Sequence, residues 1–318
     1  MMKADKRPDV ILTAMPAPIT CLVAAVLAKI WKVPHYIDAR DMWPDILLDE
    51  LKGIKKLAVF PVVLLMRIEL KVALKWAQGL IGITLPFRDY LLEVAGRIAG
   101  PTDAAFPIGY LEQDIKYDEK SEVAFWLEKG VHFSSREKII YFAGTLNKTV
   151  LTEASKVAQA LRIVEKNGLS VKLVFCGKGN AEKALRMHFF GLRNVIFPGH
   201  VGATHLRFLK EKSSIALLSV QSRKDYLNSL SNKFFDYSSG GLPIVTNLAG
   251  VPKATLERHQ AGFCYETSEE LADIIALLVL DDELLGQYSR NSRRMFVDHF
   301  DAKQVYTRFV RHLERGML

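Results

Sequence analysis

The sequence has little cysteine and no apolar run long enough to span a bilayer, and both absences narrow the class of protein. Its three cysteines, Cys21, Cys176 and Cys264, lie far apart among apolar residues. Because that spacing fits neither a disulfide framework nor a zinc site, we expect a reduced, cytoplasmic compartment. The longest apolar run, 57–66, ends at Arg67 and is too short to cross a membrane. The polar opening residues do not read as a signal peptide.

Short repeats, low-complexity tracts and nucleic-acid-binding motifs are also lacking. The 318 residues carry a net charge of +8, which favours an anionic partner such as nucleic acid, an anionic membrane surface or a phosphorylated substrate. Because the basic residues are dispersed along the chain, we expect no nucleic-acid partner. The length, with 49% hydrophobic and 25% charged residues, suits a globular protein with one large core or two cores of ordinary domain size.

The chain alternates between strand-like and helix-like segments. In the second half we predict strands at 139–142, 171–176, 195–197, 214–219, 244–246 and 262–265, and helices at 152–167, 181–188, 205–212, 253–259 and 268–280. In the first third we predict strands at 10–12, 35–38 and 80–84 and a helix at 18–31. This alternation indicates an α/β protein with parallel, doubly wound sheets and ligands at the carboxyl ends of the strands.

A polar stretch divides these two halves. We therefore expect a first Rossmann-like domain at 1–112, a linker at 113–136 and a second Rossmann-like domain at 137–298. A last helix, 299–318, is expected to pack back on the first domain.

The apolar run at 57–66 lies within a basic segment. Lys52, Lys55 and Lys56 precede the run, and Lys71 and Lys75 follow it among further apolar residues. One interpretation is an amphipathic segment at an anionic membrane surface. The other is a buried helix pair whose lysines are solvated. The sequence alone leaves both open.

The most informative segment is 229–245, where Lys233 and Asp236 lie three residues apart and so share one face of a helix. Ser231 or Asn232 can cap that helix and leave its first amides for an anionic ligand. The helix end and Lys233 would attract a diphosphate, and Asp236 could accept hydrogen bonds from ribose hydroxyls. The alternative is an ordinary surface helix with an i,i+3 charge pair.

Five segments together resemble a known family. The first, 38–44, reads Asp-Ala-Arg-Asp-Met-Trp-Pro, and the others are 142–145, 175–179, 197–201 and 229–245. In this order they resemble retaining glycosyltransferases of the GT-B fold, particularly the family 4 group that builds bacterial surface polysaccharides. The resemblance spans nearly the whole chain. It implies two Rossmann-like parallel-sheet domains, with the acceptor side in the first and the nucleotide-sugar site in the second.

The resemblance also implies roles for particular residues. Asp236 matches the acidic position that binds the donor's ribose, although family members usually have glutamate there, and Asn228 stands where a first glutamate is usual. Lys233 matches a lysine that meets the diphosphate. The full set of expected donor-binding residues is Gly144, Thr145, Lys148, Gly177, Gly199, His200, Asn228, Ser231, Asn232, Lys233 and Asp236.

The expected catalytic residues are Lys233, Arg40 and Asp41. Lys233, with Lys148 and the helix amides, would offset charge on the leaving diphosphate. The resemblance implies that no metal and no other cofactor is needed, and the lack of an aspartate-x-aspartate motif agrees with that expectation. Arg40 and Asp41 are candidates for positioning the acceptor, and a purely structural Arg–Asp pair is the alternative.

The function implied by the resemblance is retaining transfer of a sugar from a nucleoside-diphosphate sugar to a saccharide or lipid-linked acceptor. The implied process is surface polysaccharide synthesis, including lipopolysaccharide, in the cytoplasm or peripherally at the cytoplasmic face of the inner membrane. Family members usually have further βα units before the segment equivalent to 8–11, so we expect an incomplete first domain. The alternatives are a catalytically impaired or non-catalytic nucleotide-sugar-binding protein and a sugar-nucleotide epimerase of the same fold.

Overall fold

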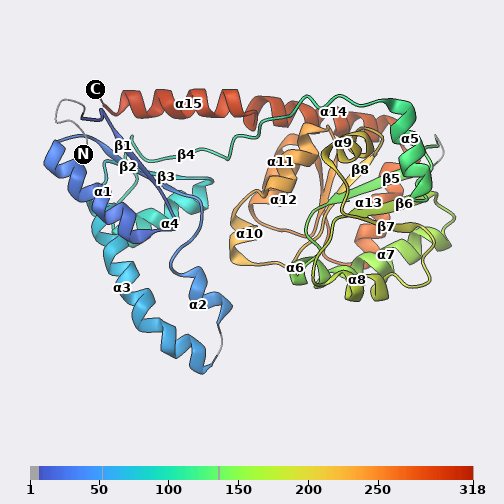
Figure 1. Cartoon of the computed structure of the whole chain (residues 1–318), viewed down its shortest axis with the longest axis horizontal. Helices are drawn as coiled ribbons and strands as arrows, with labels where there is room; N and C mark the ends of the chain where they lie inside the picture. The colour runs from blue at the N-terminus through green and yellow to red at the C-terminus, as the bar shows by residue number, and fades with distance from the viewer. Residues whose placement is uncertain (1–6, 52, 135–136, 318) are drawn as a thin grey trace. The chain divides into compact units, whose positions relative to one another are not determined.

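The computed structural model describes residues 7–51, 53–134 and 137–317, which divide into two units (Figure 1). Unit 1 holds the described residues up to Gly109 together with the segment from Ala302, and unit 2 runs from Tyr110 to Asp301. Each unit contains a parallel sheet with helices, so the predicted fold class of two Rossmann-like α/β domains is confirmed.

The domain boundary differs in place from the expected one. The segment 113–136, which we expected to be a linker, belongs to unit 2 and contains helix α5, Glu119–Glu128. Residues 135 and 136 of that segment lie outside the described residues. Helix α5 forms because the Asp118 side chain accepts a hydrogen bond from the Ser121 amide at its start and because Trp126 is fully buried.

Unit 1 has a four-stranded sheet in the order β1-β2-β3-β4. Its strands are β1 (Ile11–Ala14), β2 (His35–Ala39), β3 (Gly79–Gly82) and β4 (Ala104–Ala105), all parallel. Its connecting helices are α1 (Pro18–Trp31), α2 (Ile46–Glu50), α3 (Ile54–Trp76) and α4 (Leu85–Ala95). Because each strand pairs with the one before it, right-handed crossovers put these connections on one face of the sheet.

Alternate side chains of the strands face two different cores in unit 1. On the helix side, Ile37 and Leu80 pack in a large cluster with residues of α1, α3 and α4. On the other side, Tyr36 and Ile81 pack against helix α15 (Ala302–Arg315) through Phe309 and Leu313.

Helix α3 is a single helix of 23 residues with Pro61 inside it, so of the two interpretations left open for this segment the buried helix pair is wrong. Its buried residues are Val63, Leu70, Ala73 and Leu74, and most of its other apolar side chains are exposed. Lys52 lies outside the described residues. In the described parts of the chain, no helix is both long enough and apolar enough to cross a membrane.

Unit 2 has a six-stranded parallel sheet in the order β10-β9-β8-β5-β6-β7. Its strands are β5 (Lys138–Ala143), β6 (Val171–Cys176), β7 (Val195–Gly199), β8 (Ile215–Leu218), β9 (Ile244–Thr246) and β10 (Gly262–Cys264). The strand order reverses between β5 and β8. In open α/β sheets such a reversal leaves a crevice at the carboxyl ends of the strands, where ligands bind.

Helices flank this sheet (Figure 1). Besides α5 they are α6 (Lys148–Leu151), α7 (Ala154–Lys166), α8 (Glu182–His188), α9 (Ala203–Glu211), α10 (Lys224–Asn228), α11 (Asn232–Ser239), α12 (Val251–His259), α13 (Ser268–Leu280) and α14 (Asp282–His299). The helix predicted at 152–167 is preceded by the short helix α6. Asn147 starts it by accepting hydrogen bonds from the amides of Thr149 and Val150.

Candidate functional site

Two glycine loops meet at the carboxyl ends of β5 and β6. The Gly144 amide donates to the Cys176 carbonyl at 2.9 Å, and the Gly177 amide donates to the Gly199 carbonyl at 2.8 Å. A Cβ atom on Gly177 would lie 1.8 Å from the Gly144 carbonyl oxygen. Only glycine allows the two backbones to come this close, which explains the residue type at this position.

A first hollow of about 280 Å³ opens beside these loops. Four of the expected donor-binding residues line it: Gly144, Thr145, Gly177 and His200. Lys178 also lines it, although the sequence analysis assigned it no role. Its position between two glycines at the end of a strand was the signal that could have identified it.

A second hollow of about 270 Å³ lies between the Thr145 turn and the start of α11. Four of the expected donor-binding residues line it: Thr145, Ser231, Asn232 and Lys233. The side chains that the prediction missed include Asn147, Thr149 and Ser229. Since Thr145 lines both hollows, the two are neighbours around the 143–145 turn.

The first turn of α11 faces the second hollow. Ser231 occupies the cap position, but its side chain makes no capping bond, and its buried hydroxyl oxygen has no partner among the described residues. The first amides of a helix have no intrahelical acceptor, and the helix dipole adds positive potential there. This end of α11 is therefore suited to an anion.

Lys233 is half-buried, and its side chain passes directly over Gly144. A Cβ atom on Gly144 would lie 2.3 Å from Lys233 Cε and 2.9 Å from Nζ. Burial lowers the pKa of Lys233. Across the described ranges, the structure assigns no hydrogen bond or ion pair to this ammonium group. The contact recorded for this cation is with an aromatic ring, that of Phe142, whose centroid lies 5.8 Å from Nζ. A desolvated cation without a counter-charge is unfavourable, and an anionic ligand would relieve that cost.

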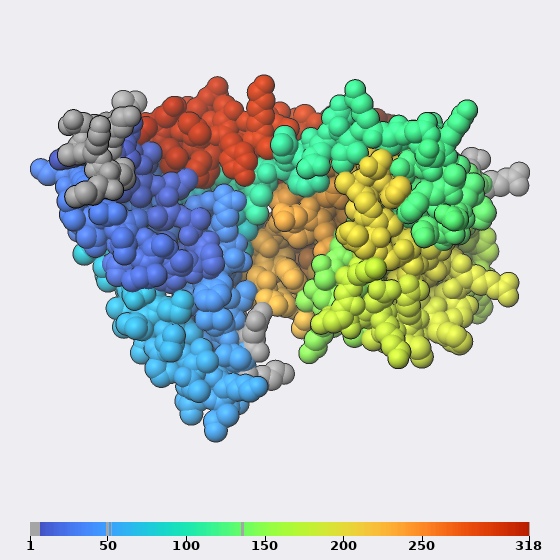
Figure 2. All heavy atoms as spheres, in the orientation of Figure 1, coloured from blue at the N-terminus to red at the C-terminus, as the bar shows by residue number. Residues whose placement is uncertain are grey.

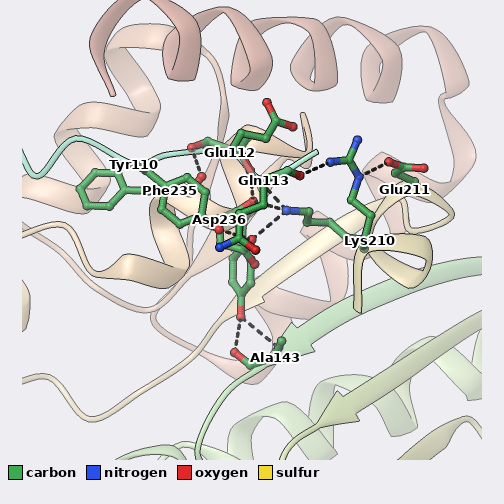
Figure 3. Close-up of polar contacts among 12 residues, drawn as sticks. Tyr110, Glu112, Gln113, Ala143, Lys210, Glu211, Phe235 and Asp236 are labelled. Atoms are coloured by element: carbon green, nitrogen blue, oxygen red, sulfur yellow. Dashed lines mark hydrogen bonds and ion pairs between the residues drawn. The ribbon is translucent and has the colours of Figure 1, made fainter. Parts of the chain in front are cut away.

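Asp236 does not pair with Lys233. Its Oδ1 atom accepts hydrogen bonds from Lys210 Nζ at 2.7 Å and from the Tyr110 hydroxyl at 2.9 Å (Figure 3). Lys210 is buried and also donates to the Asp236 main-chain oxygen at 3.2 Å and to Ser239 Oγ at 3.3 Å. The i,i+3 charge pair left open by the sequence is therefore absent, and Asp236 has a different cation as its partner.

Asp236, Lys210 and Tyr110 line a third hollow of about 340 Å³. It shares Ala143 and Leu206 with the first hollow, so all three hollows surround the 143–145 turn. Lys210 was not among the site residues expected from the sequence. A lysine next to the apolar residues Phe208 and Leu209 gives only a weak signal of burial. The neighbouring sequence does not identify Asp236 as the partner of this lysine.

Three expected donor-binding residues line none of these hollows. Lys148 is exposed at the start of α6, and Asn228 is the last residue of α10. Gly199 is the last residue of β7, and its carbonyl oxygen accepts a hydrogen bond from the Gly177 amide.

Arg40 and Asp41 lie in unit 1, just after β2. The Arg40 guanidinium bonds to the carboxylate of Asp38, with Nε at 2.9 Å and Nη2 at 2.8 Å from Oδ2. Burial raises the pKa of Asp38, and the Arg40 charge partly offsets this. Arg40 thus forms a structural ion pair with Asp38, and its side chain also hydrogen-bonds with Tyr306. Asp41 is exposed.

No group of three or more His, Cys, Asp or Glu side chains that could hold a metal occurs among the residues that the structure describes. The groups available to a ligand near the 143–145 turn are instead the ammonium group of Lys233 and the backbone amides of the first turn of α11.

A protein-family model described as "Glycosyl transferases group 1" matches residues 126–295. The match covers more than half of the chain and includes both glycine loops and α11. No curated protein matches the sequence.

Many solved structures resemble the chain. Anabaena HepE (Alr3699) in complex with UDP has 15% sequence identity and a TM-score of 0.72, over 96% of this chain and 79% of that one. The same protein in complex with UDP-glucose has 16% identity and a TM-score of 0.67, over the same shares of the two chains.

Two further structures extend the comparison. Sucrose-phosphate synthase from Thermosynechococcus elongatus has 12% identity and a TM-score of 0.63, over 96% of this chain and 73% of that one. A glycosyltransferase from Rickettsia africae has 12% identity and a TM-score of 0.61, over 97% of this chain and 98% of that one. At these identities the likeness shows the fold, which is GT-B.

Proposed function

Because the chain belongs to the glycosyl transferases group 1 family, we propose that it transfers a sugar from a nucleoside-diphosphate sugar to a saccharide or lipid-linked acceptor, with retention of configuration. The observation that carries the proposal is the half-buried ammonium group of Lys233 between a glycine turn and the first turn of α11, which has no hydrogen bond or ion pair with the described residues. A diphosphate would supply the negative charge that this group lacks.

In this proposal the diphosphate lies at the 143–145 turn, where the three hollows meet. The amides that follow Gly144 and those of the first turn of α11 donate to the phosphate oxygens. The ribose lies beside Asp236 in the third hollow. Uridine diphosphate is the first ligand to test, because HepE, which has the same fold, is known in complex with UDP and with UDP-glucose.

The reaction breaks the bond between the donor sugar and the diphosphate, and negative charge grows on the departing phosphate oxygen. Lys233 and the helix amides stabilise that charge, which lowers the barrier to transfer. The positive charge thus comes from the chain's own groups, and the proposal uses no metal ion. His200, which lines the first hollow, borders the space available to the nucleoside.

The acceptor would be positioned by unit 1. The Arg40 guanidinium is fixed by Asp38, yet 36% of its side chain is exposed, so it can still donate to an acceptor hydroxyl. The proposed process is the synthesis of a bacterial surface polysaccharide such as lipopolysaccharide, in the cytoplasm or at the cytoplasmic face of the inner membrane.

Calorimetry with uridine and guanosine diphosphates tests the donor site. No binding of either at millimolar concentration would overturn the assignment. If a diphosphate binds, UDP-glucose is incubated with a lipid-linked acceptor, and the anomeric configuration of the product is read by NMR. Binding without transfer to any acceptor would instead favour a non-catalytic nucleotide-sugar-binding protein, for which the asparagine at position 228 is the supporting observation.

A further inference from the structure

Lys178 lies between two glycines that pack closely against the turn after β5. A Cβ atom on Gly177 would lie 1.8 Å from the Gly144 carbonyl oxygen, and one on Gly179 would lie 2.1 Å from the Leu146 carbonyl oxygen. The Leu146 amide in turn donates a hydrogen bond to the Lys178 carbonyl oxygen at 3.1 Å. Because the backbone on either side of Lys178 is packed this closely, the loop fixes the direction in which the lysine side chain leaves it.

The Lys178 side chain runs beside Gly199 and lines the first hollow. Its Cε atom lies 3.6 Å from the place that a Cβ atom on Gly199 would take. In the described parts of the chain, the structure assigns no hydrogen bond or ion pair to the Lys178 ammonium group, and no acidic residue lines this hollow. A ligand in the first hollow therefore meets a cationic donor whose hydrogen-bonding capacity the described residues leave unused.

The first hollow also has apolar walls suited to a flat ring. Ala143, Val201 and Leu206 line it, and Val201 is buried. Helix α9, which carries Leu206, lies on the surface of unit 2, where Figure 2 shows it as yellow spheres. Ligand sites commonly combine apolar walls with a few polar groups that fix the orientation of the ligand. Lys178 and His200 supply such polar groups here.

The first hollow adjoins the place proposed for the ribose. In the proposed function the diphosphate lies at the turn after β5, and the ribose lies beside Asp236 in the third hollow. The first and third hollows share Ala143 and Leu206, so the base attached to that ribose would enter the first hollow. The Lys178 ammonium group would then face an edge of the base.

We propose that Lys178 selects donor nucleotides whose base has a keto oxygen on its pairing edge. An ammonium group has donor hydrogens and no acceptor. It can therefore bind the O4 atom of uracil or the O6 atom of guanine, but not the amino group that cytosine and adenine carry at the corresponding position. The inference deepens the proposed function and rests on it, because it names the nucleotides that the donor site accepts: those of uridine and guanosine rather than those of cytidine and adenosine.

The test is calorimetric titration of the full chain with UDP, CDP, GDP and ADP. Because a hydrogen bond from a charged donor is lost with an amino base, the wild type should bind UDP at least about tenfold more tightly than CDP, and GDP more tightly than ADP by a similar factor. Lys178→Met keeps an apolar chain beside Gly199 and removes the donor hydrogens. It should weaken UDP and GDP binding by that factor and change CDP and ADP binding by less than about twofold, so that the preference disappears.

Three further variants separate base recognition from other effects. Lys178→Arg, which also has donors and no acceptor, should keep the preference for keto bases. Lys183→Met makes the same change as Lys178→Met at an exposed position on α8 and should alter none of the four affinities. Lys233→Met acts at the diphosphate and should weaken UDP and CDP binding by the same factor, which leaves their ratio unchanged. Circular dichroism verifies that each variant is folded.

Different results would refute different steps of the reasoning. If none of the four nucleotides binds to the wild type, the proposed donor site is wrong, and the inference falls with it. If nucleotides bind but the wild type does not distinguish UDP from CDP, the donor site stands and the selection of keto bases is wrong. If folded Lys178→Met weakens UDP and CDP binding equally, its ammonium group meets the phosphates and not the base. Where the pyrimidine nucleotides do not bind, the ratio of GDP to ADP affinity decides in the same way.

Discussion

Replacing Lys233 with methionine should weaken diphosphate binding and stabilise the empty protein at the same time. Methionine keeps the apolar chain over Gly144 but removes the ammonium group, which lies beside the turn where the phosphates are expected. One hydrogen bond from a charged donor contributes about 1.5–3 kcal/mol. Its loss should raise the dissociation constant for UDP about 10- to 150-fold.

The opposite effect on stability follows from the lowered pKa of Lys233. Burial lowers this pKa in the folded state, so between the folded and unfolded pKa values the unfolded chain binds more protons. The charged lysine therefore costs stability at neutral pH, and that cost declines as the pH rises from the folded pKa to the unfolded pKa. Lys233→Met should unfold at a higher temperature than the wild type at pH 7, with a smaller difference at higher pH.

Calorimetry with UDP and thermal unfolding at several pH values measure the two effects. Lys183→Met, at an exposed position on α8, is the matched control and should change neither quantity. If Lys233→Met bound UDP within twofold of the wild type, or unfolded at a lower temperature, the ammonium group would not be the unpaired diphosphate ligand inferred from the geometry.

Three more predictions concern single features of the two units. Burial lowers the pKa of His35 to about 4, so the stability of unit 1 should fall by on the order of 3 kcal/mol as the pH drops from 6.5 to 4, and less so in His35→Gln; thermal unfolding across that pH range measures this. Gly177→Ala would put a methyl group 1.8 Å from a backbone oxygen and should abolish UDP binding in calorimetry, whereas Gly202→Ala, whose nearest contact is 3.8 Å away, should not. Lys210→Met should lower the free energy of unfolding in urea by about 3 kcal/mol by leaving Asp236 without its cation, and adding Asp236→Asn should recover part of the loss.

The inner strands of unit 2, β5, β6, β8 and β9, could be predicted closely because they are largely buried on both faces. Such strands read as continuous apolar runs, and the predicted and observed bounds of β6, Val171–Cys176, are the same. Helix α5 was missed although its signals were present. Asp118 caps it and Trp126 anchors it, but the charged residues around them resemble a solvated linker.

The residues of the candidate site also fall into some that could be predicted from the sequence and others that could not. Glycine turns and a helix start are encoded by adjacent residues, so Gly144, Gly177 and Lys233 could be assigned from sequence. Contacts between distant residues could not. Helical spacing identifies which neighbours share a face with Asp236, but it carries no information about Lys210, which lies 26 positions earlier on a different helix.

The choice of partner for Asp236 decides the charge of the proposed donor site. Had Lys233 paired with Asp236, as their spacing allows, the two charges would have cancelled beside the 143–145 turn. Lys210 and Tyr110 instead both bind Oδ1 of Asp236, so within the described residues the hydrogen bonds to this carboxylate leave Oδ2 for a ligand hydroxyl. In the proposed donor site Lys210 would thus act as a positioning residue: it neutralises and orients the Asp236 carboxylate, and it leaves the charge of Lys233 available for a diphosphate.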